Sequence, residues 1–319
     1  MILTLAAYYQ IILTYSVLGG LGGALLNAPS YGTIAHFFNV KRGLATGIAM
    51  TAGGIGGVIF PLILRPLLGK HGVGFAWSCR VLGFIFLALA IPANLFIKSR
   101  QSIQLRNEAK SKAGSMWPDL TVFRDRRFAL TALGVFFMEW GLFVPLTYIV
   151  SYAAAHGTGS SDGSLLISLL NAGSVVGRFL PGLLADKFGR FNIIIVTITL
   201  CAATILGIWL PCGNSKGGLV AFSVTFGFAS GSNLSLIPVC LGQFCEAQNY
   251  GRYFTAATMV ASFGTLSSVP IGGALVGVGH QSTGWMALII FSGVSYIVAL
   301  ACYTSARVLT VGWQPLAKF

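Results

Sequence analysis

The stretch Gly182-Leu183-Leu184-Ala185-Asp186-Lys187-Phe188-Gly189-Arg190 is a short charged segment between two long apolar runs. The flanking runs, Leu165–Ala185 and Ile193–Pro211, are close to the roughly 20 residues that a helix needs to cross a bilayer. Neither run alternates apolar with polar residues, as the strands of a membrane barrel do. The stretch therefore predicts a tight loop between two membrane-spanning helices.

The same pattern continues along the whole chain. Of its 319 residues, 55% are hydrophobic and 8% are charged, whereas an average soluble domain is about 25% charged. This composition excludes a soluble enzyme, a disordered chain and a disulfide scaffold. We predict an all-α polytopic membrane protein with nine transmembrane helices: Tyr8–Tyr31, Leu44–Leu68, Phe75–Ile97, Phe128–Ala153, Leu165–Ala185, Ile193–Pro211, Gly218–Gln243, Phe254–Val278 and Trp285–Arg307.

The basic residues predict the orientation of these helices. Of the 20 Lys and Arg residues, fifteen fall in loops on one side, four fall on the other side, and Arg178 lies within a span. The positive-inside rule makes the fifteen-residue side cytoplasmic and places the C-terminus there. Because the basic residues lie between apolar runs, the net charge of +13 suits loops on anionic lipid better than a nucleic-acid interface. We therefore expect a lipid bilayer as partner and no nucleic acid, and the sequence identifies no protein partner.

A long polar stretch divides the chain unevenly. Residues 98–127 contain eight basic and three acidic side chains, which is typical of a solvated linker. We predict a partial N-terminal bundle of three helices over 1–97, a cytoplasmic linker over 98–127, a six-helix bundle over 128–307 and a cytoplasmic tail over 308–319.

The two parts on either side of the linker resemble each other. Arg42 precedes Pro61 by 19 residues in one small-residue helix, and Arg252 precedes Pro270 by 18 in another. The span ahead of each basic loop carries an Asn and then a Pro: Asn27 with Pro29, and Asn233 with Pro238. Chance similarity between Gly- and Ala-rich helices is the alternative. A parallel repeat of six helices builds one large transporter fold, and on that mapping we expect the chain to lack about three N-terminal helices.

Three stretches resemble one family. Gly182–Arg190 resembles the GxxxDxxGR loop signature of the major facilitator superfamily, with Phe191 in place of a second basic residue. Phe37–Ala49 resembles the fifth-helix signature of the monocarboxylate transporter branch, with Val40 replacing a basic residue, and Gly141–Tyr152 is similar to the seventh helix of its fungal form. The resemblance covers nearly the whole chain. It implies a secondary transporter that alternates access between two six-helix bundles.

One predicted helix carries a polar stripe along a single face. Its members recur at spacings of 4, 3, 3 and 4: Ser164, Ser168, Asn171, Ser174 and Arg178. A guanidinium is costly in lipid, so this face should line water or protein. Arg178 could then bind an anionic solute beside Asn171 and Ser174; the alternative is a structural arginine paired with Glu139 or with helix-end carbonyls. In the family that the chain resembles, an aspartate stands where this chain has Ser174.

Glu139 is the acidic residue that we place deep within a span. Our hypothesis is that it replaces the missing aspartate as the group that couples transport to protons. The alternatives are a permanent ion pair or a glutamate that reaches the interface. Asn27 and Asn233 are further candidates for contact with substrate, from opposite halves.

A second polar stripe lies on a later helix and recurs at spacings of 3, 4, 3 and 3: Thr255, Thr258, Ser262, Thr265 and Ser268. Close helix packing explains this stripe as well as a pore wall does.

Asp186 ends a predicted helix whose dipole disfavours a carboxylate there. We therefore expect another partner to hold it, and the candidates are a neighbouring helix N-terminus, near Arg252–Thr255, and Lys187 or Arg190. Such a cluster must break when the cytoplasmic side opens, and a plain loop cluster is the alternative. The candidate gating residues are Gly182, Asp186, Lys187, Gly189, Arg190, Arg252, Lys41 and Arg42.

The six cysteines show no CxxC spacing, and we read neither a disulfide nor a metal site from them. No nucleophile–base pattern appears, so we expect no enzyme, no cofactor and no metal. We predict a transporter that moves a small organic anion, a monocarboxylate or a related metabolite together with protons, in the plasma or vacuolar membrane. A secondary-metabolite efflux transporter and a truncated, non-transporting membrane protein are the alternatives.

Overall fold

The computed structural model of the chain describes residue 9 and residues 12–38, 40–68, 72, 74–97, 120–157, 160–212, 215–277 and 281–314. The described residues are helical throughout, apart from short turns. The elements, in chain order, are η2 (Ile12–Leu18), α2 (Gly19–Phe37), α3 (Arg42–Leu68), α4 (Gly74–Phe96), η3 (Leu120–Arg124), α6 (Arg126–Ala155), α7 (Ser160–Phe188), α8 (Arg190–Thr204), η4 (Ile205–Trp209), α9 (Leu210–Cys212), α10 (Lys216–Leu241), η5 (Ala247–Asn249), α11 (Tyr250–Gly277) and α12 (Gln281–Val311).

Nine helices in the described part of the chain are long and apolar enough to cross a membrane, which confirms the predicted number of spans. Their ends differ from the predicted ends by a few residues. The first span, for example, extends to Phe37 and the last to Val311. The chain is therefore a multi-pass integral membrane protein. The sequence did not predict the two π-helical segments, η2 and η4, which continue into regular helix at Gly19 and Leu210.

The chain divides into two compact units. One comprises residues 1–37 and 57–114, and the other comprises residues 38–56 and 115–319. The boundary falls inside α3, so the first part of that helix packs with the later helices. The division at 98–127 and the domains over 1–97, 128–307 and 308–319 remain predictions.

The unit with residues 1–37 and 57–114 contains α2, the second part of α3 and α4. Phe60 on α3 packs against Phe86 on α4, with ring centroids 5.3 Å apart. Within α4, the Arg80 guanidinium lies 4.6 Å from the centre of the Trp77 ring. Most large apolar side chains of α2 and α4 are exposed, as expected of surfaces that face lipid or further protein.

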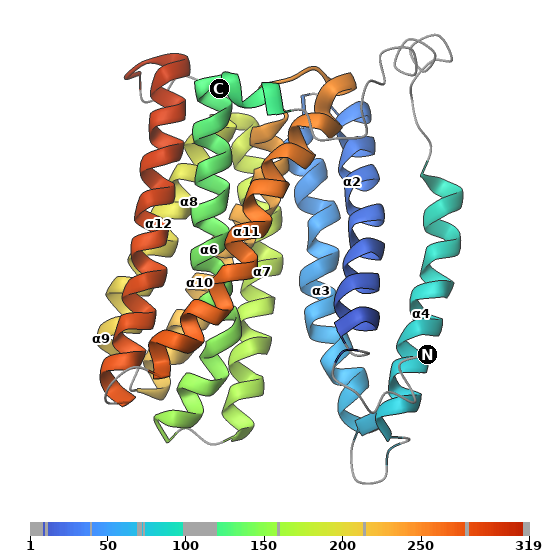
Figure 1. Ribbon diagram of the computed structural model, residues 1–319, viewed down its shortest axis with the longest axis vertical. Helices are drawn as coiled ribbons and strands as arrows, with labels where there is room; N and C mark the ends of the chain where they lie inside the picture. Colours follow the sequence, from blue (N-terminus) through green and yellow to red (C-terminus); the bar gives the residue numbers. More distant parts are fainter. Residues whose placement is uncertain are drawn as a thin grey trace. The chain divides into compact units, whose positions relative to one another are not determined.

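The second unit is a helical bundle (Figure 1), and the burial of α10 places this helix in its interior. In the most apolar stretch of α10, 78% of the residues are buried, which is the largest share among the described spans. Figure 1 shows α6, α7, α8 and α12 running alongside one another, with α11 crossing α6 at a slant. Small residues permit the closest contact, which lies between α7 and α10. A Cβ atom added to Gly173 would lie 2.6 Å from the Val224 oxygen, and one added to Gly231 would lie 2.5 Å from the Ser174 oxygen.

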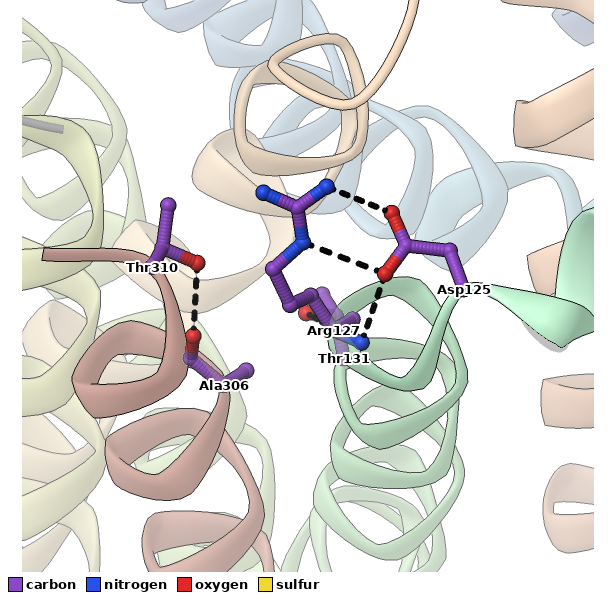
Figure 2. Close-up of polar contacts among 5 residues, drawn as sticks. All are labelled: Asp125, Arg127, Thr131, Ala306 and Thr310. Atoms are coloured by element: carbon purple, nitrogen blue, oxygen red, sulfur yellow. Dashed lines mark hydrogen bonds and ion pairs between the residues drawn. The ribbon is translucent and has the colours of Figure 1, made fainter.

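The residues just before α6 fold onto this bundle. Val122 in η3 is buried, and Phe123 packs on Phe128, which in turn packs on Tyr253 of α11. Figure 2 shows how Asp125 caps α6: its carboxylate accepts hydrogen bonds from both the backbone and the guanidinium of Arg127. The Arg127 guanidinium holds the pKa of Asp125 below its usual range. The last part of the predicted linker is thus folded, and its residues 98–119 lie outside the described part of the chain.

Candidate functional site

The first turns of α3 lie directly against the last turns of α7. A Cβ atom added to Gly43 would lie 2.6 Å from the Gly182 oxygen, and one added to Gly182 would lie 2.7 Å from the Gly43 oxygen. A side chain on Gly47 would overlap the carbonyl of Arg178. Glycine is needed at these positions because the backbones of α3 and α7 touch along this contact. Gly182 of the loop signature therefore allows the two helices to pack closely.

Asp186 holds the N-terminus of α3. Its Oδ1 accepts a hydrogen bond from the Gly43 N–H at 3.0 Å, and its Oδ2 accepts one from the Leu44 N–H at 2.9 Å. The first N–H groups of a helix have no partner within the helix, and the helix dipole favours a negative charge beside them. The Nε atom of Arg190 lies 4.0 Å from Oδ1.

Of the candidate partners, the helix start near Arg252–Thr255 is therefore wrong, because the helix that begins beside the end of α7 is α3. Of the two predicted basic partners, Arg190 lies beside Asp186, whereas the Lys187 side chain is exposed. Gly189 links α7 to α8 with a φ of 97°, a conformation that suits glycine. Sequence reasoning identified the type of partner but not the helix.

Arg42 makes a complementary contact at the same end of the bundle. Its side chain is buried, and Nη1 donates to the Gly242 carbonyl at 3.0 Å, at the C-terminus of α10. The guanidinium also lies 5.9 Å from the centre of the Tyr250 ring. A cation is favourable at a helix C-terminus. Arg42 therefore ties α3 to α10, while the neighbouring Lys41 is exposed.

Arg178 points from α7 to the backbone of α3. Its Nη1 donates to the Met50 carbonyl at 2.6 Å, and a Cβ atom added to Gly53 would lie 2.6 Å from the same nitrogen. The other two candidates on α7 lie differently. Asn171 donates to Ile167 of its own helix, and Ser174 is buried against Gly231 of α10. Ser174 and Arg178 of this stripe thus meet different neighbouring helices.

Glu139 contacts α11. Its Oε2 accepts a hydrogen bond from the Thr265 hydroxyl at 3.0 Å, and the Glu139 side chain is half-buried. On the next turn, Ser268 donates to the Trp140 carbonyl at 2.6 Å. In the described part of the chain, Glu139 and Arg178 bond to different helices and form no ion pair. The alternative of an Arg178–Glu139 pair is therefore wrong, and the observed carbonyl partner lies inside α3 rather than at a helix end.

The two candidate asparagines have different surroundings. Asn233 is fully buried, accepts a hydrogen bond from Thr197 at 2.7 Å and donates to the Cys201 sulfur at 3.2 Å. Both partners belong to α8, so these bonds join α8 to α10. Asn27 is exposed on α2. A role for either residue in contact with substrate remains a prediction.

The polar stripe of α11 serves two purposes. Thr265 and Ser268 reach α6, whereas Thr255, Thr258 and Ser262 donate to carbonyls of α11 itself. Arg252 lies in the first turn of α11, beside an open cavity of about 220 Å³. That cavity is lined by Thr121, Val122, Asp125, Asn249, Arg252 and Tyr253.

Comparison with known proteins decides the family. Residues 1–268 match the model of the Major Facilitator Superfamily. The chain belongs to this superfamily. The riboflavin transporter MCH5 of Saccharomyces cerevisiae is 34% identical over 96% of this chain, which spans 61% of that relative's length. An MFS-type transporter of Penicillium oxalicum, opdF, is 36% identical over 98% of this chain and 71% of its own length.

A solved superfamily structure shows the same fold. The transporter FucP, in the outward conformation, superposes with a TM-score of 0.73 over 94% of this chain and 77% of its own chain, at 17% sequence identity. The predicted major facilitator fold is confirmed.

The Asp186 cap supports a first prediction for this superfamily member. Asp186→Asn retains one acceptor oxygen but removes the charge beside the α3 N-terminus, which should cost about 1 kcal/mol. We expect a lower midpoint of thermal unfolding in detergent, measured by tryptophan fluorescence. Lys187→Gln is the control, because the Lys187 side chain is exposed. Equal midpoints for Asp186→Asn and the parent protein would contradict the capping role.

Cys245 supports a second prediction, since it lies close to Arg42. Burial raises the pKa of the Cys245 thiol to about 11, although the Arg42 charge lowers it. At pH 7.5 we expect alkylation by N-ethylmaleimide to be about a hundredfold slower than for an ordinary thiol, because each pKa unit removes tenfold of the thiolate. Peptide mass spectrometry should show the rate still rising above pH 9. A rate that levels off near pH 9 would show that the thiol is not desolvated.

Proposed function

We propose that the protein is a secondary transporter that moves a small organic anion or monocarboxylate together with protons, by alternating access. The observation that carries this proposal is the pair of half-buried charged side chains, Arg178 and Glu139, within spans of one unit. Ionisable groups in membrane spans are costly and usually serve transport. A guanidinium suits binding of a carboxylate, and a carboxyl group suits carriage of a proton.

The contact between Glu139 and Thr265 supports the proton step. A neutral carboxyl group is much less costly to bury than a carboxylate. The Thr265 hydroxyl donates to the carboxylate, and it can also accept a hydrogen bond from the protonated form. One neighbour therefore satisfies both protonation states of Glu139, as a group that cycles between them requires.

The contacts around the start of α3 support the gating step. Asp186 bonds to the N-terminus of α3, and Arg42 bonds from α3 to the C-terminus of α10. We propose that these contacts face the cytoplasm and break when the transporter opens inward, with the C-terminus on the same side. The distribution of basic residues supports this orientation. The plasma membrane or the vacuolar membrane is the proposed location.

A second candidate solute class follows from the similarity to a riboflavin transporter. On that reading the protein moves a heterocyclic metabolite, and Arg178 contributes to structure rather than to anion binding. Export of a secondary metabolite by the same alternating access is a variant of this second candidate function.

Uptake by purified protein in liposomes tests the proposal. The probes are radiolabelled acetate, lactate, benzoate and riboflavin, each with and without an inward proton gradient. We expect at least one monocarboxylate to accumulate beyond the level in protein-free liposomes when the outside is acidic. Uptake of riboflavin alone would favour the second candidate. Absence of flux for every probe, in either direction, would contradict a transport role of the chain for these solutes.

A further inference from the structure

The contact between Arg178 and α3 is unusual for a residue that is to bind solute. The guanidinium donates to the backbone carbonyl of Met50, which lies within α3. Gly53, one turn further on, leaves the space in which Nη1 lies, because a Cβ atom there would be 2.6 Å from Nη1 and 3.6 Å from Cζ. Met50 and Gly53 thus form a seat for the Arg178 guanidinium on α3.

The partner in this seat is a neutral carbonyl group. A carboxylate offers Arg two parallel hydrogen bonds together with an opposite charge, which a carbonyl group lacks. Glu139, the acidic residue placed deep within a span, bonds to Thr265 on α11 and does not compete for Arg178. An anionic solute that reaches Arg178 would therefore displace the Met50 carbonyl.

The seat continues the close contact between α3 and α7. Gly43 and Gly47 meet the backbone of α7 on one side of it, and Gly54 meets Val175 on the other. Release of Arg178 removes the charged hydrogen bond from this contact. Packing between small residues and the Asp186 cap also hold α3 against α7 there.

We infer that Gly53 is a positioning residue: it seats Arg178 on α3 when no solute is bound, and an anionic solute draws Arg178 from the Met50 carbonyl and so loosens α3 from α7. This inference rests on the proposed function, in which Arg178 binds the anion. The seat would favour the closed contact in the empty protein. Solute binding would then promote opening by removing the bond between Arg178 and the Met50 carbonyl.

Two adjacent glycines give a matched pair of variants. In Gly53→Ala, the new methyl group meets the Arg178 guanidinium. In Gly54→Ala, it lies 2.7 Å from a Val175 methyl group and disturbs the same helix contact without reaching Arg178. Arg178→Gln is a third variant, which removes the guanidinium that the anion would draw away from α3. It tests the inference even if Gly53→Ala fails to fold.

Spin labels on two exposed positions, Ile48 of α3 and Val176 of α7, report the separation of the helices. The measurement is pulsed electron paramagnetic resonance on protein whose six native cysteines are replaced by serine. We expect saturating benzoate to shift the parent protein toward longer distances. Gly53→Ala should already be shifted, by about tenfold in the ratio of open to closed populations, and should respond little to benzoate. Gly54→Ala should retain the response, and Arg178→Gln should lose it.

Identical behaviour of Gly53→Ala and Gly54→Ala would overturn the inference, because the Arg178 contact would then be packing alone. A response to benzoate that survives in Arg178→Gln would also overturn it. Failure of the proposed function is recognised separately: neither benzoate nor the other monocarboxylates would be taken up by the parent protein in liposomes. The comparison of the two glycine variants without solute does not depend on that uptake.

Discussion

Glu139→Gln is expected to abolish proton-driven accumulation of solute. Glutamine keeps an oxygen that accepts the Thr265 hydrogen bond but cannot exchange a proton. For transport of one proton with each anion, a gradient of one pH unit supports roughly tenfold accumulation. The parent protein should approach that ratio faster than protein-free liposomes do, and the variant should show no accumulation beyond that of protein-free liposomes.

Exchange of labelled for unlabelled solute is the control for Glu139→Gln, because exchange needs no net movement of protons. We expect this exchange to persist in the variant. Thr265→Val tests the neighbour, and should weaken accumulation without abolishing it, because the carboxyl group remains. Accumulation by Glu139→Gln at the level of the parent protein would assign the proton to another group.

Gly227→Ala is expected to destabilise the bundle more than the other substitutions that we consider. An added methyl group would overlap the Leu170 carbonyl of α7, at the closest contact of the interior helix α10. Overpacking typically costs about 1–3 kcal/mol, and a clash with backbone cannot be relieved by a side-chain rotation. We expect a loss of about 3 kcal/mol or more, seen as low yield and early aggregation on size-exclusion chromatography.

Gly217→Ala is the matched control on the same helix, because no atom lies within 4 Å of its added Cβ atom. This variant should behave like the parent protein, or be slightly more stable, since alanine favours helix. If Gly227→Ala were as stable as Gly217→Ala, the close approach of α7 and α10 would be incorrect.

The spans could be predicted from the sequence because hydropathy is a local property. Every apolar run of sufficient length in the described part of the chain is a helix. The ends were less predictable: α6 begins at Arg126 because Asp125 caps it, and the α12 helix continues past Arg307. Helix capping depends on single side chains, and hydropathy averaged over many residues does not show where such a side chain ends a helix.

The partners of the charged residues could be predicted only by type. The helix dipole favours a helix N-terminus or a cation as partner of Asp186, but only tertiary packing determines that the N-terminus is that of α3. The seat of Arg178 was missed, because a backbone carbonyl such as that of Met50 has no sequence signature. The spacing of Gly43 and Gly47, four residues apart, indicates a close helix contact, but it does not identify α7 as the partner helix.

The two polar stripes show the same limit of sequence-based prediction: periodicity identifies a helix face but not the helix that it contacts. Helical periodicity placed Ser174 and Arg178 on one face of α7, yet one meets α10 and the other meets α3, since a face in the interior of a bundle touches more than one neighbour. Thr265 belonged to a stripe for which packing and a pore wall were equally good explanations. Its contact with Glu139 makes it the member of that stripe with a direct place in the proposed proton step.

The most direct test of the central claim is whether solute brings protons with it. Liposomes containing the protein and an internal pH-sensitive dye are placed in a weakly buffered medium at the same pH, and a monocarboxylate that gives uptake is added outside. The proposed mechanism predicts acidification of the interior with the parent protein, beyond that of protein-free liposomes, and none beyond it with Glu139→Gln. Solute entry without such acidification would contradict proton-coupled transport.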